Sequence, residues 1–295
     1  MTAVDTNHEE RQMSFGLVGA GSAVSAWAAG IVITKSINMG GLAIGVYRFS
    51  IFSVCIVAWM AFRGTPFRWS IMRSSMLGGL ALGADIAFFF SAIKLTTVVN
   101  ATLIGSLQPI VVGVVAARFM GETIRGRDAL WSLVALVGVG GVILASSDAV
   151  GWSLRGDLLA FAAMLSWSGY FIFSKQSKGR MSSTEYTAGT AVWSTIIATP
   201  LAVGFGQDLG FPSWRDLLLI LVTVAVAGVV GHSLMNWSLV RIPLWIGSTF
   251  TLLMPVVSAA LAWVFLDESI TIAQAAAMGL VLVSLAMIVS GQRGH

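Results

Sequence analysis

Long apolar stretches alternate with short polar segments along nearly the whole chain. An α-helix needs about 20 predominantly apolar residues to cross the roughly 30 Å hydrocarbon core of a bilayer. On this length scale the pattern predicts ten spans, at 15–34, 42–62, 74–93, 98–118, 129–147, 157–174, 186–206, 216–238, 244–266 and 272–290. The connections are too short for a soluble catalytic or nucleotide-binding domain, so any function has to lie among the spans or at their ends.

The spans are expected to be helices rather than barrel strands. Strands of a membrane barrel are segments of about ten residues in which apolar and polar positions alternate. Residues 111–117 and 217–230 are almost continuously apolar and lack this alternation. The predicted fold class is therefore an all-α integral membrane protein with ten transmembrane helices.

Composition agrees with a lipid environment. Hydrophobic residues make up 57% of the 295 residues and charged residues only 10%, whereas a soluble domain has about 25% charged residues. The net charge of +4 is scattered between apolar runs and forms no patch, which argues against a nucleic-acid partner and for contact with a membrane surface. Cys55 is the single cysteine, so disulfide frameworks and cysteine-based zinc sites are excluded, and no cofactor or metal is expected.

The distribution of lysine and arginine predicts the orientation, because basic loops are retained on the cytoplasmic side. With the amino terminus inside, the inner segments hold Arg11, Arg63, Arg68, Arg73, Arg118, Arg125, Arg127, Lys175, Lys178, Arg180, Arg241 and Arg293. The outer loops hold only Lys35, Lys94, Arg155 and Arg215. Both ends, residues 1–14 and 291–295, are therefore predicted to be cytoplasmic tails.

The chain contains an internal repeat. Residues 25–35 match residues 165–175 without gaps, and the match includes Trp27 with Trp167 and Lys35 with Lys175. Further on, Pro109, Phe119, Glu122 and Ile124 recur at the same spacing as Pro255, Phe265, Glu268 and Ile270. Two repeats are predicted, at 15–147 and 148–290. Five spans is an odd number, so the second repeat enters the membrane from the opposite side, an arrangement that recurs in secondary transporters.

The repeated segments resemble the EamA-type members of the drug/metabolite transporter superfamily. Repeats of that family end a membrane helix with a proline-centred run followed by an acidic residue, as residues 107–122 and 253–268 do here. Trp27, Trp167 and the Tyr-Arg-Phe sequence at 47–49 also match the family pattern. Members carry amino acids, sugars, nucleotide sugars, phosphorylated metabolites and drugs, so the resemblance is weak for the substrate.

Among the branches, the chain looks most like the aromatic amino acid exporters called YddG. That resemblance implies a multi-pass protein of the bacterial inner membrane that exports aromatic or other neutral amino acids by alternating access. It also implies a central cavity lined by the first, third, fourth, sixth, eighth and ninth helices. One departure is Arg48, whose counterpart in the second repeat is Ala188.

Two ionisable residues are central in their spans. Asp85 lies midway through the third span and His232 midway through the eighth, one position from the counterpart of Asp85. A charged side chain at the centre of a bilayer costs about 2.5 to 3.5 kcal/mol on insertion scales, so such residues face the interior. As a pair they could bind the two ends of a zwitterion or relay a proton; the alternative is that each serves only helix packing.

Further substrate-binding candidates come from matched or clustered positions. Trp27 and Trp167 are predicted to form an aromatic wall or a tight helix contact, and Tyr170 shares a helical face with Ser166 and Ser174. The other polar candidates are Asn100, Thr102, Asn236, Ser248 and Thr251. Pro109 and Pro255 are predicted to kink their helices and act as hinges.

Arg48 is predicted to anchor its helix, with a long side chain that reaches the membrane surface, and contact with the substrate is the alternative. An intramembrane enzyme that uses Ser233 beside His232, or Asp85, is the competing function class. The sequence holds no H-E-x-x-H and no G-x-S-x-G, so an enzyme is disfavoured. It holds no phosphate loop, so a primary pump is disfavoured as well. A structural or receptor-like protein is the third alternative, and the oligomeric state stays open.

Overall fold

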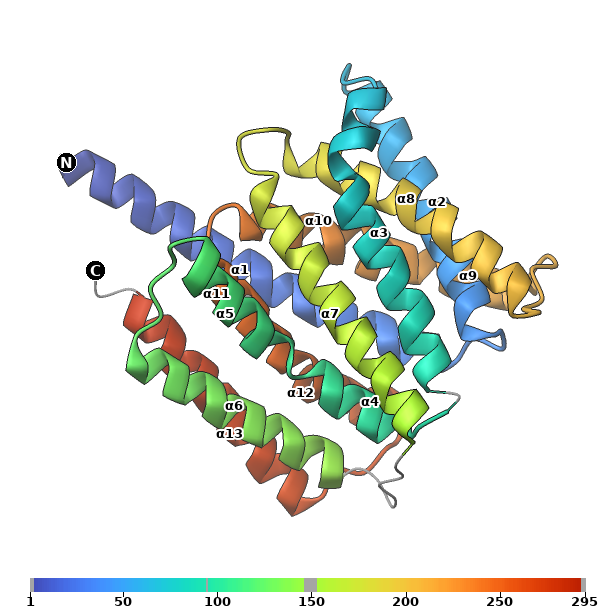
Figure 1. Cartoon of the computed structure of the whole chain (residues 1–295). Helices are drawn as coiled ribbons and strands as arrows, with labels where there is room; N and C mark the ends of the chain where they lie inside the picture. Colours follow the sequence, from blue (N-terminus) through green and yellow to red (C-terminus); the bar gives the residue numbers. More distant parts are fainter. Residues whose placement is uncertain (1–2, 94, 146–152, 293–295) are drawn as a thin grey trace.

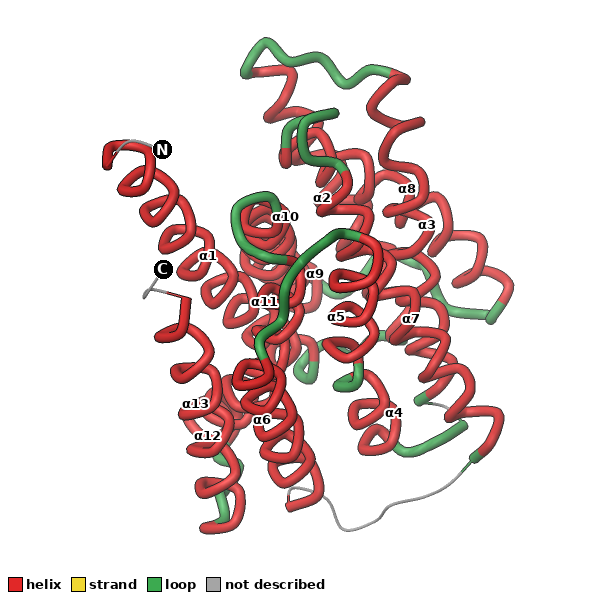
Figure 2. The backbone as a smooth tube through the Cα atoms, turned by 60° about the vertical axis from the view of Figure 1, so that its left-hand side comes forward, coloured by secondary structure: helices red, strands yellow, loops and turns green. Residues whose placement is uncertain are grey.

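The computed structural model describes residues 3–93, 95–145 and 153–292, without the side chains of residues 3–10, 98 and 99. Every regular element in these ranges is a helix (Figure 2). The predicted boundary between the repeats at 147–148, the last residues of the fifth predicted span, and Lys94 and Arg293 lie outside the described residues.

The first half consists of α1 (Ala3–Thr34), α2 (Gly41–Phe62), α3 (Trp69–Ala92), α4 (Val98–Gly105), α5 (Gln108–Phe119) and α6 (Gly126–Ala145). The second half consists of α7 (Leu154–Gln176), α8 (Ser183–Gly204), α9 (Trp214–Thr223), the π-helix η1 (Val224–His232), α10 (Ser233–Leu239), α11 (Leu244–Thr249), the 3₁₀-helix η2 (Phe250–Leu252), α12 (Leu253–Leu266) and α13 (Ile272–Gln292). Each of the ten predicted spans thus coincides with a helix or with a run of consecutive helices.

Nine helices among the described residues are long and apolar enough to cross a membrane. The remaining predicted span, at 186–206, is α8, a helix of 22 residues that is not among those nine. Its buried face carries the hydroxyl groups of Thr187, Thr190 and Ser194, which make it less apolar than the others. The amino-terminal segment that was predicted as a tail continues α1 back to Ala3.

The two halves pack around a pseudo-twofold axis. Helix α3 lies against α7 and α8, and its counterpart α9–η1–α10 lies against α1 and α2. Helices α6 and α13, the last of each half, pair with each other along their length (Figure 1). Helices α1 and α7 run in opposite directions, and the start of α1 and the end of α13 lie on the same side of the molecule. This arrangement confirms the predicted inverted repeats.

The spans that contain Pro109 and Pro255 are interrupted, whereas α8 continues through Pro200. The first breaks at Ser106 and Leu107, between α4 and α5, and the second becomes a 3₁₀-helix at Phe250–Leu252. Pro109 and Pro255 each lie just after the interruption, since proline lacks an N–H for the helical hydrogen bond and fits the first turn of a helix. The kinks are present, and the role of the two prolines as hinges stays a prediction.

Candidate functional site

His232 lies at the centre of a group of aromatic rings at the contact between the two halves. Its ring centroid is 5.2 Å from that of Trp27, 5.7 Å from Phe49 and 5.8 Å from Tyr170. We call these residues, with Phe52, Trp167 and Phe171, the central aromatic cluster. Trp27, Phe49 and Phe52 come from the first half and the other members from the second.

The matched tryptophans of the repeat meet in this cluster. The rings of Trp27 and Trp167 lie 5.1 Å apart in an edge-to-face arrangement. Gly231 makes room for Trp27, because a Cβ atom at this position would come within 2.5 Å of the indole. The Nε1 atom of Trp27 is buried and has no hydrogen-bond partner among the described residues. The predicted aromatic pair therefore exists, and one of its polar atoms is unsatisfied.

A hydrogen-bond network fixes the polar side of the cluster. Nδ1 of His232 and the Tyr170 hydroxyl lie 3.2 Å apart, and Asn236 donates from Nδ2 to the Tyr170 hydroxyl at 2.8 Å and to the Thr187 hydroxyl at 2.9 Å. The Ser174 hydroxyl donates to Oδ1 of Asn236 at 2.7 Å. Asn236 therefore has partners on both sides of its amide and holds α7, α8 and α10 together.

His232 is the last residue of the π-helix η1. A π-helical segment is rare and is often found at functional sites, because its wider turn changes the direction of the side chains that follow. The apolar sequence of residues 224–231 gives no signal for this geometry. The sequence placed His232 in the interior without indicating what surrounds it.

Arg48 faces the interior, which contradicts the prediction that it anchors α2 at the surface. It lines a narrow pocket together with His232, Phe49 and Phe52, and the π-helix contributes Val224 and Gly228. The physical reason is the helical phase of α2, since Gly45, Phe49 and Phe52 on the same face are buried. The pocket has no room for a water molecule in this structure, so a ligand could enter it only after the surrounding helices move. Among the described residues, Arg48 forms no hydrogen bond and no ion pair.

Asp85 is partly buried in α3, beside the buried Ile86. It has no hydrogen bond and no ion pair within the part of the chain that the structure describes. Nδ1 of His232 lies 3.2 Å from the Tyr170 hydroxyl, and a joint role of Asp85 and His232 in binding a zwitterion or relaying a proton stays a prediction. In the repeat, His232 corresponds to Ile86, and Asp85 corresponds to Gly231.

The remaining polar candidates lie outside the central aromatic cluster. Asn100 lies at the start of α4, where Nδ2 is 3.5 Å from Oδ1 of Asp157. The backbone carbonyl of Thr102, one turn from the end of α4, accepts from Ser106 at 2.8 Å. Asn100 therefore contributes to the contact of α4 with α7, and a role of Asn100 and Thr102 in substrate binding stays a prediction.

Ser248 and Thr251 bond within the interrupted ninth span. The Ser248 hydroxyl donates to the carbonyl of Trp245 at 2.8 Å. The Thr251 hydroxyl donates to the carbonyl of Ser248 and to Oε1 of Gln108, at 2.6 Å and 3.0 Å. The bond between Thr251 and Gln108 joins the two halves at their interrupted helices.

A larger cavity, of about 280 Å³, lies away from the cluster. It opens between α5, α6 and α11, and its lining includes Ser106, Pro109, Ser132, Trp245 and Thr249. Pro109 is the one predicted site residue in this lining. The cavity therefore follows the interrupted helices rather than the central aromatic cluster.

Two ion pairs join the halves, one at the carboxyl end of α1 and one at the carboxyl end of α7, and they lie on opposite sides of the molecule because these helices run in opposite directions. Lys35, just after α1, pairs with Glu268 at 2.9 Å, and Lys175, at the end of α7, pairs with Glu122 at 3.7 Å. The repeat relates the two lysines to each other, and likewise the two glutamates. We call these pairs the Glu268 junction and the Glu122 junction.

Glu122 and Glu268 each follow a turn of the same type. The residue before each one has a left-handed backbone, with φ of 68° at Gly121 and 55° at Asp267. Glycine adopts this conformation freely, and aspartate adopts it more readily than most residues do. The amides of Glu122 and Glu268 then donate back to the matched carbonyls of Ala116 and Ala262. Local structure at the two junctions is therefore equivalent.

The comparisons with known proteins cover nearly the whole chain. The model of the EamA-like transporter family matches residues 14–144 and 154–290, one match for each repeat. A protein named "Probable amino-acid metabolite efflux pump" from Escherichia coli (strain K12) is 26% identical over 287 residues, with 92% of this chain and 93% of the relative covered. A "Threonine/homoserine exporter RhtA" from Salmonella typhimurium (strain SL1344) is 22% identical over 278 residues, with 92% and 88% covered.

A solved structure described only as "Crystal structure of protein" has the same fold. It superposes with a TM-score of 0.81 at 20% sequence identity, and the match covers 94% of this chain and 98% of the other. At this identity the likeness supports the arrangement of the helices and carries no information about the substrate.

Proposed function

The chain belongs to the EamA-like transporter family, and from this premise we propose that it exports neutral amino acids by alternating access. The family and the relatives are transporters rather than enzymes, so the intramembrane enzyme is no longer a competing function. The names of two relatives, an amino-acid metabolite efflux pump and a threonine/homoserine exporter, support amino acids as the substrate class.

The central aromatic cluster is the observation that carries the proposal. Rings from both halves surround one ionisable residue, His232, at the contact between the repeats. Substrate sites of inverted-repeat transporters lie at the repeat interface near the middle of the membrane. An apolar wall beside a small number of polar groups suits a substrate with charged ends and an uncharged side chain.

The two junctions support alternating access. Each junction ties a helix end of one half to the other half, at opposite ends of the molecule. A cycle in which one junction opens while the other stays closed would expose the cluster to each side in turn. With the basic residues inside, the Glu122 junction is cytoplasmic and the Glu268 junction faces outward in the bacterial inner membrane.

Uptake into liposomes that hold the purified protein tests the proposal. Labelled threonine, phenylalanine, glutamate and glucose would be compared, with Trp167→Ala as the site variant and Trp214→Ala, an exposed tryptophan, as the matched control. We expect saturable uptake of neutral amino acids, lowered at least about tenfold in Trp167→Ala and unchanged in the control. Uptake of glucose without any amino acid would refute the substrate class and leave the fold untouched.

The same assay separates two finer hypotheses. Preference for phenylalanine over threonine would support the aromatic specificity implied by the YddG resemblance, and the reverse preference would support a substrate like those in the names of the relatives. Asp85 is the candidate for proton coupling or for the substrate ammonium, since it has no partner among the described residues. Asp85→Asn that transports normally but no longer responds to a pH gradient would assign the coupling role.

A further inference from the structure

Arg48 is an interior arginine that the proposed transport cycle does not yet use. It lies on the buried face of α2, in the same helical phase as Gly45, Phe49 and Phe52. Inside a membrane protein, an arginine is paired, hydrated or functional. Among the described residues no carboxylate pairs with Arg48, so its usual protein partner is missing.

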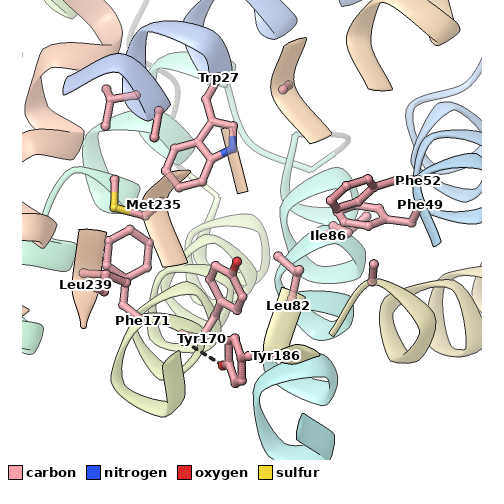
Figure 3. Close-up of a cluster of buried hydrophobic side chains, with 14 of the residues drawn as sticks. Trp27, Phe49, Phe52, Leu82, Ile86, Tyr170, Phe171, Tyr186, Met235 and Leu239 are labelled. Atoms are coloured by element: carbon pink, nitrogen blue, oxygen red, sulfur yellow. Dashed lines mark hydrogen bonds between the residues drawn. The ribbon is translucent and has the colours of Figure 1, made fainter. Parts of the chain in front are cut away.

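Two further hydrogen-bond donors belong to His232, which lines the same pocket as Arg48, and to Trp27, which contacts His232. His232 lines the same pocket, and its Nδ1 atom is taken by the Tyr170 hydroxyl, which leaves Nε2 as the ring nitrogen without a hydrogen bond among the described residues. The ring of Trp27 lies 5.2 Å from His232, and Nε1 of Trp27 is buried without a partner. Figure 3 shows this indole nitrogen on the side of the ring that faces Phe49 and Phe52, which line the pocket with Arg48.

We propose that Arg48, His232 and the Nε1 atom of Trp27 form a carboxylate subsite that binds the acid end of the transported amino acid. A guanidinium binds a carboxylate through two parallel hydrogen bonds, and an indole N–H adds one neutral donor. The rings of Phe49 and Phe52 exclude water and strengthen this interaction. The inference rests on the proposed function and deepens it, because it requires a substrate that carries a free carboxylate.

The position of the subsite fits a transport cycle. Arg48 and Trp27 belong to the first half and His232 to the second, so a bound carboxylate would join the two halves. The π-helix that ends at His232 packs on both α1 and α2, which carry the other two donors. Substrate binding would therefore act directly on the contact that has to rearrange.

The test compares an amino acid with its amino alcohol, which keeps the ammonium and the side chain but lacks the carboxylate. Uptake of labelled threonine is measured in liposomes with unlabelled threonine or threoninol as competitor. The variants are Arg48→Gln, Arg48→Lys and the matched control Arg63→Gln, an exposed arginine just after the other end of α2.

We expect the wild type and Arg63→Gln to prefer threonine over threoninol by at least about tenfold, and Arg48→Gln to lose this preference through a higher KM for threonine. Arg48→Lys keeps the charge but loses the paired hydrogen bonds, so its KM should lie between the two. An Arg48→Gln protein that still prefers threonine would overturn the subsite. If that variant does not fold, an Arg48→Lys KM equal to that of the wild type would overturn it.

Ligand binding can be measured without transport, so the subsite can be tested separately from the proposed function. Thermal unfolding in detergent is measured with acetate and with inorganic phosphate, because a ligand that binds only the folded state raises the unfolding temperature. Stabilisation of the wild type by acetate, absent in Arg48→Gln, would support the subsite even if no amino acid were transported. Stabilisation by phosphate alone, or no stabilisation together with unchanged competition, would overturn the carboxylate assignment.

Discussion

The Glu122 junction and the Glu268 junction occupy equivalent positions in the repeat but lie in different surroundings. At the Glu122 junction the two side chains are 14% and 20% exposed, whereas at the Glu268 junction they are 52% and 53% exposed. The Glu122 carboxylate also accepts from the backbone amides of Leu244 and Trp245, at 2.7 Å and 3.2 Å. Among the described residues, Glu268 bonds only to Lys35 through its side chain.

The same sequence pattern in the two repeats has therefore produced two ion pairs that differ in their burial. Glu122 caps the amino end of α11, where backbone N–H groups have no helical partner, and Lys175 also donates to the carbonyl of Ile242. An exposed ion pair contributes about 0.2 to 1 kcal/mol, whereas removing one partner of a buried pair costs about 3 to 5 kcal/mol. In this structure the Glu122 end is therefore the more firmly closed of the two.

The largest expected effect comes from removing Glu122. Glu122→Ala leaves Lys175 half-buried without its carboxylate and uncaps α11, so we expect a loss of about 3 kcal/mol in the free energy of unfolding. The matched variant Glu268→Ala should lose about 0.5 kcal/mol. Thermal and denaturant unfolding in detergent measure both, and equal losses would erase the difference between the junctions.

Exchanging the two charged residues within each junction shows how much each junction contributes to uptake. Lys35→Glu combined with Glu268→Lys restores an ion pair in the same place, so uptake should return to within about twofold of the wild type. Lys175→Glu combined with Glu122→Lys should stay several-fold impaired, because a lysine cannot accept from the amides of Leu244 and Trp245. Full recovery of uptake in the second exchange would show that the cap has no role.

The rates at which introduced cysteines react with a thiol reagent should show a smaller difference between the two junctions. In a Cys55→Ser background, a cysteine at Lys35 should react faster than a cysteine at Lys175, since the two lysines are 53% and 20% exposed. Labelling rates with a membrane-impermeant maleimide in detergent measure this difference. A faster reaction at Lys175 would mean that the populated state is closed at the opposite end.

Ionic strength should have the smallest effect. Salt screens exposed charges more than partly buried ones, so a rise in salt should weaken the Glu268 junction and increase labelling at a cysteine placed at Ser36. Labelling at a cysteine placed at Gln176, beside the Glu122 junction, should change less. Equal salt responses at both positions would indicate that the two junctions have similar exposure in solution.

The repeat made much of the fold predictable. Hydrophobic length gave the spans, and the match between residues 109–124 and 255–270 indicated that Glu122 and Glu268 are equivalent. Local sequence also predicted the kinks at Pro109 and Pro255, because proline removes a backbone donor, whereas α8 continues through Pro200. The unequal burial of the two glutamates depends on which distant residues pack against them, and the repeat alone carries no information about those contacts.

The candidate site was predicted in part. Trp27 and Trp167 come together because positions matched by the repeat meet at its axis, and Tyr170 and His232 lie beside them. Arg48 was assigned to the surface because a residue near a span end can reach it, and only the helical phase of α2 decides otherwise. Asn236 stays a predicted substrate ligand, and nothing in the sequence indicated its bonds to Ser174, Tyr170 and Thr187.

The most direct test of alternating access is to lock the Glu268 junction. Cysteines at Lys35 and Glu268, in a Cys55→Ser background, would be joined by a short cleavable bifunctional thiol reagent that spans the space of the two lost side chains. Threonine uptake into liposomes is then measured before cross-linking, after it and after cleavage, with Lys35→Cys alone as the control. We predict that uptake stops in the cross-linked protein and returns on cleavage; uptake at the full rate in a completely cross-linked protein would contradict the account.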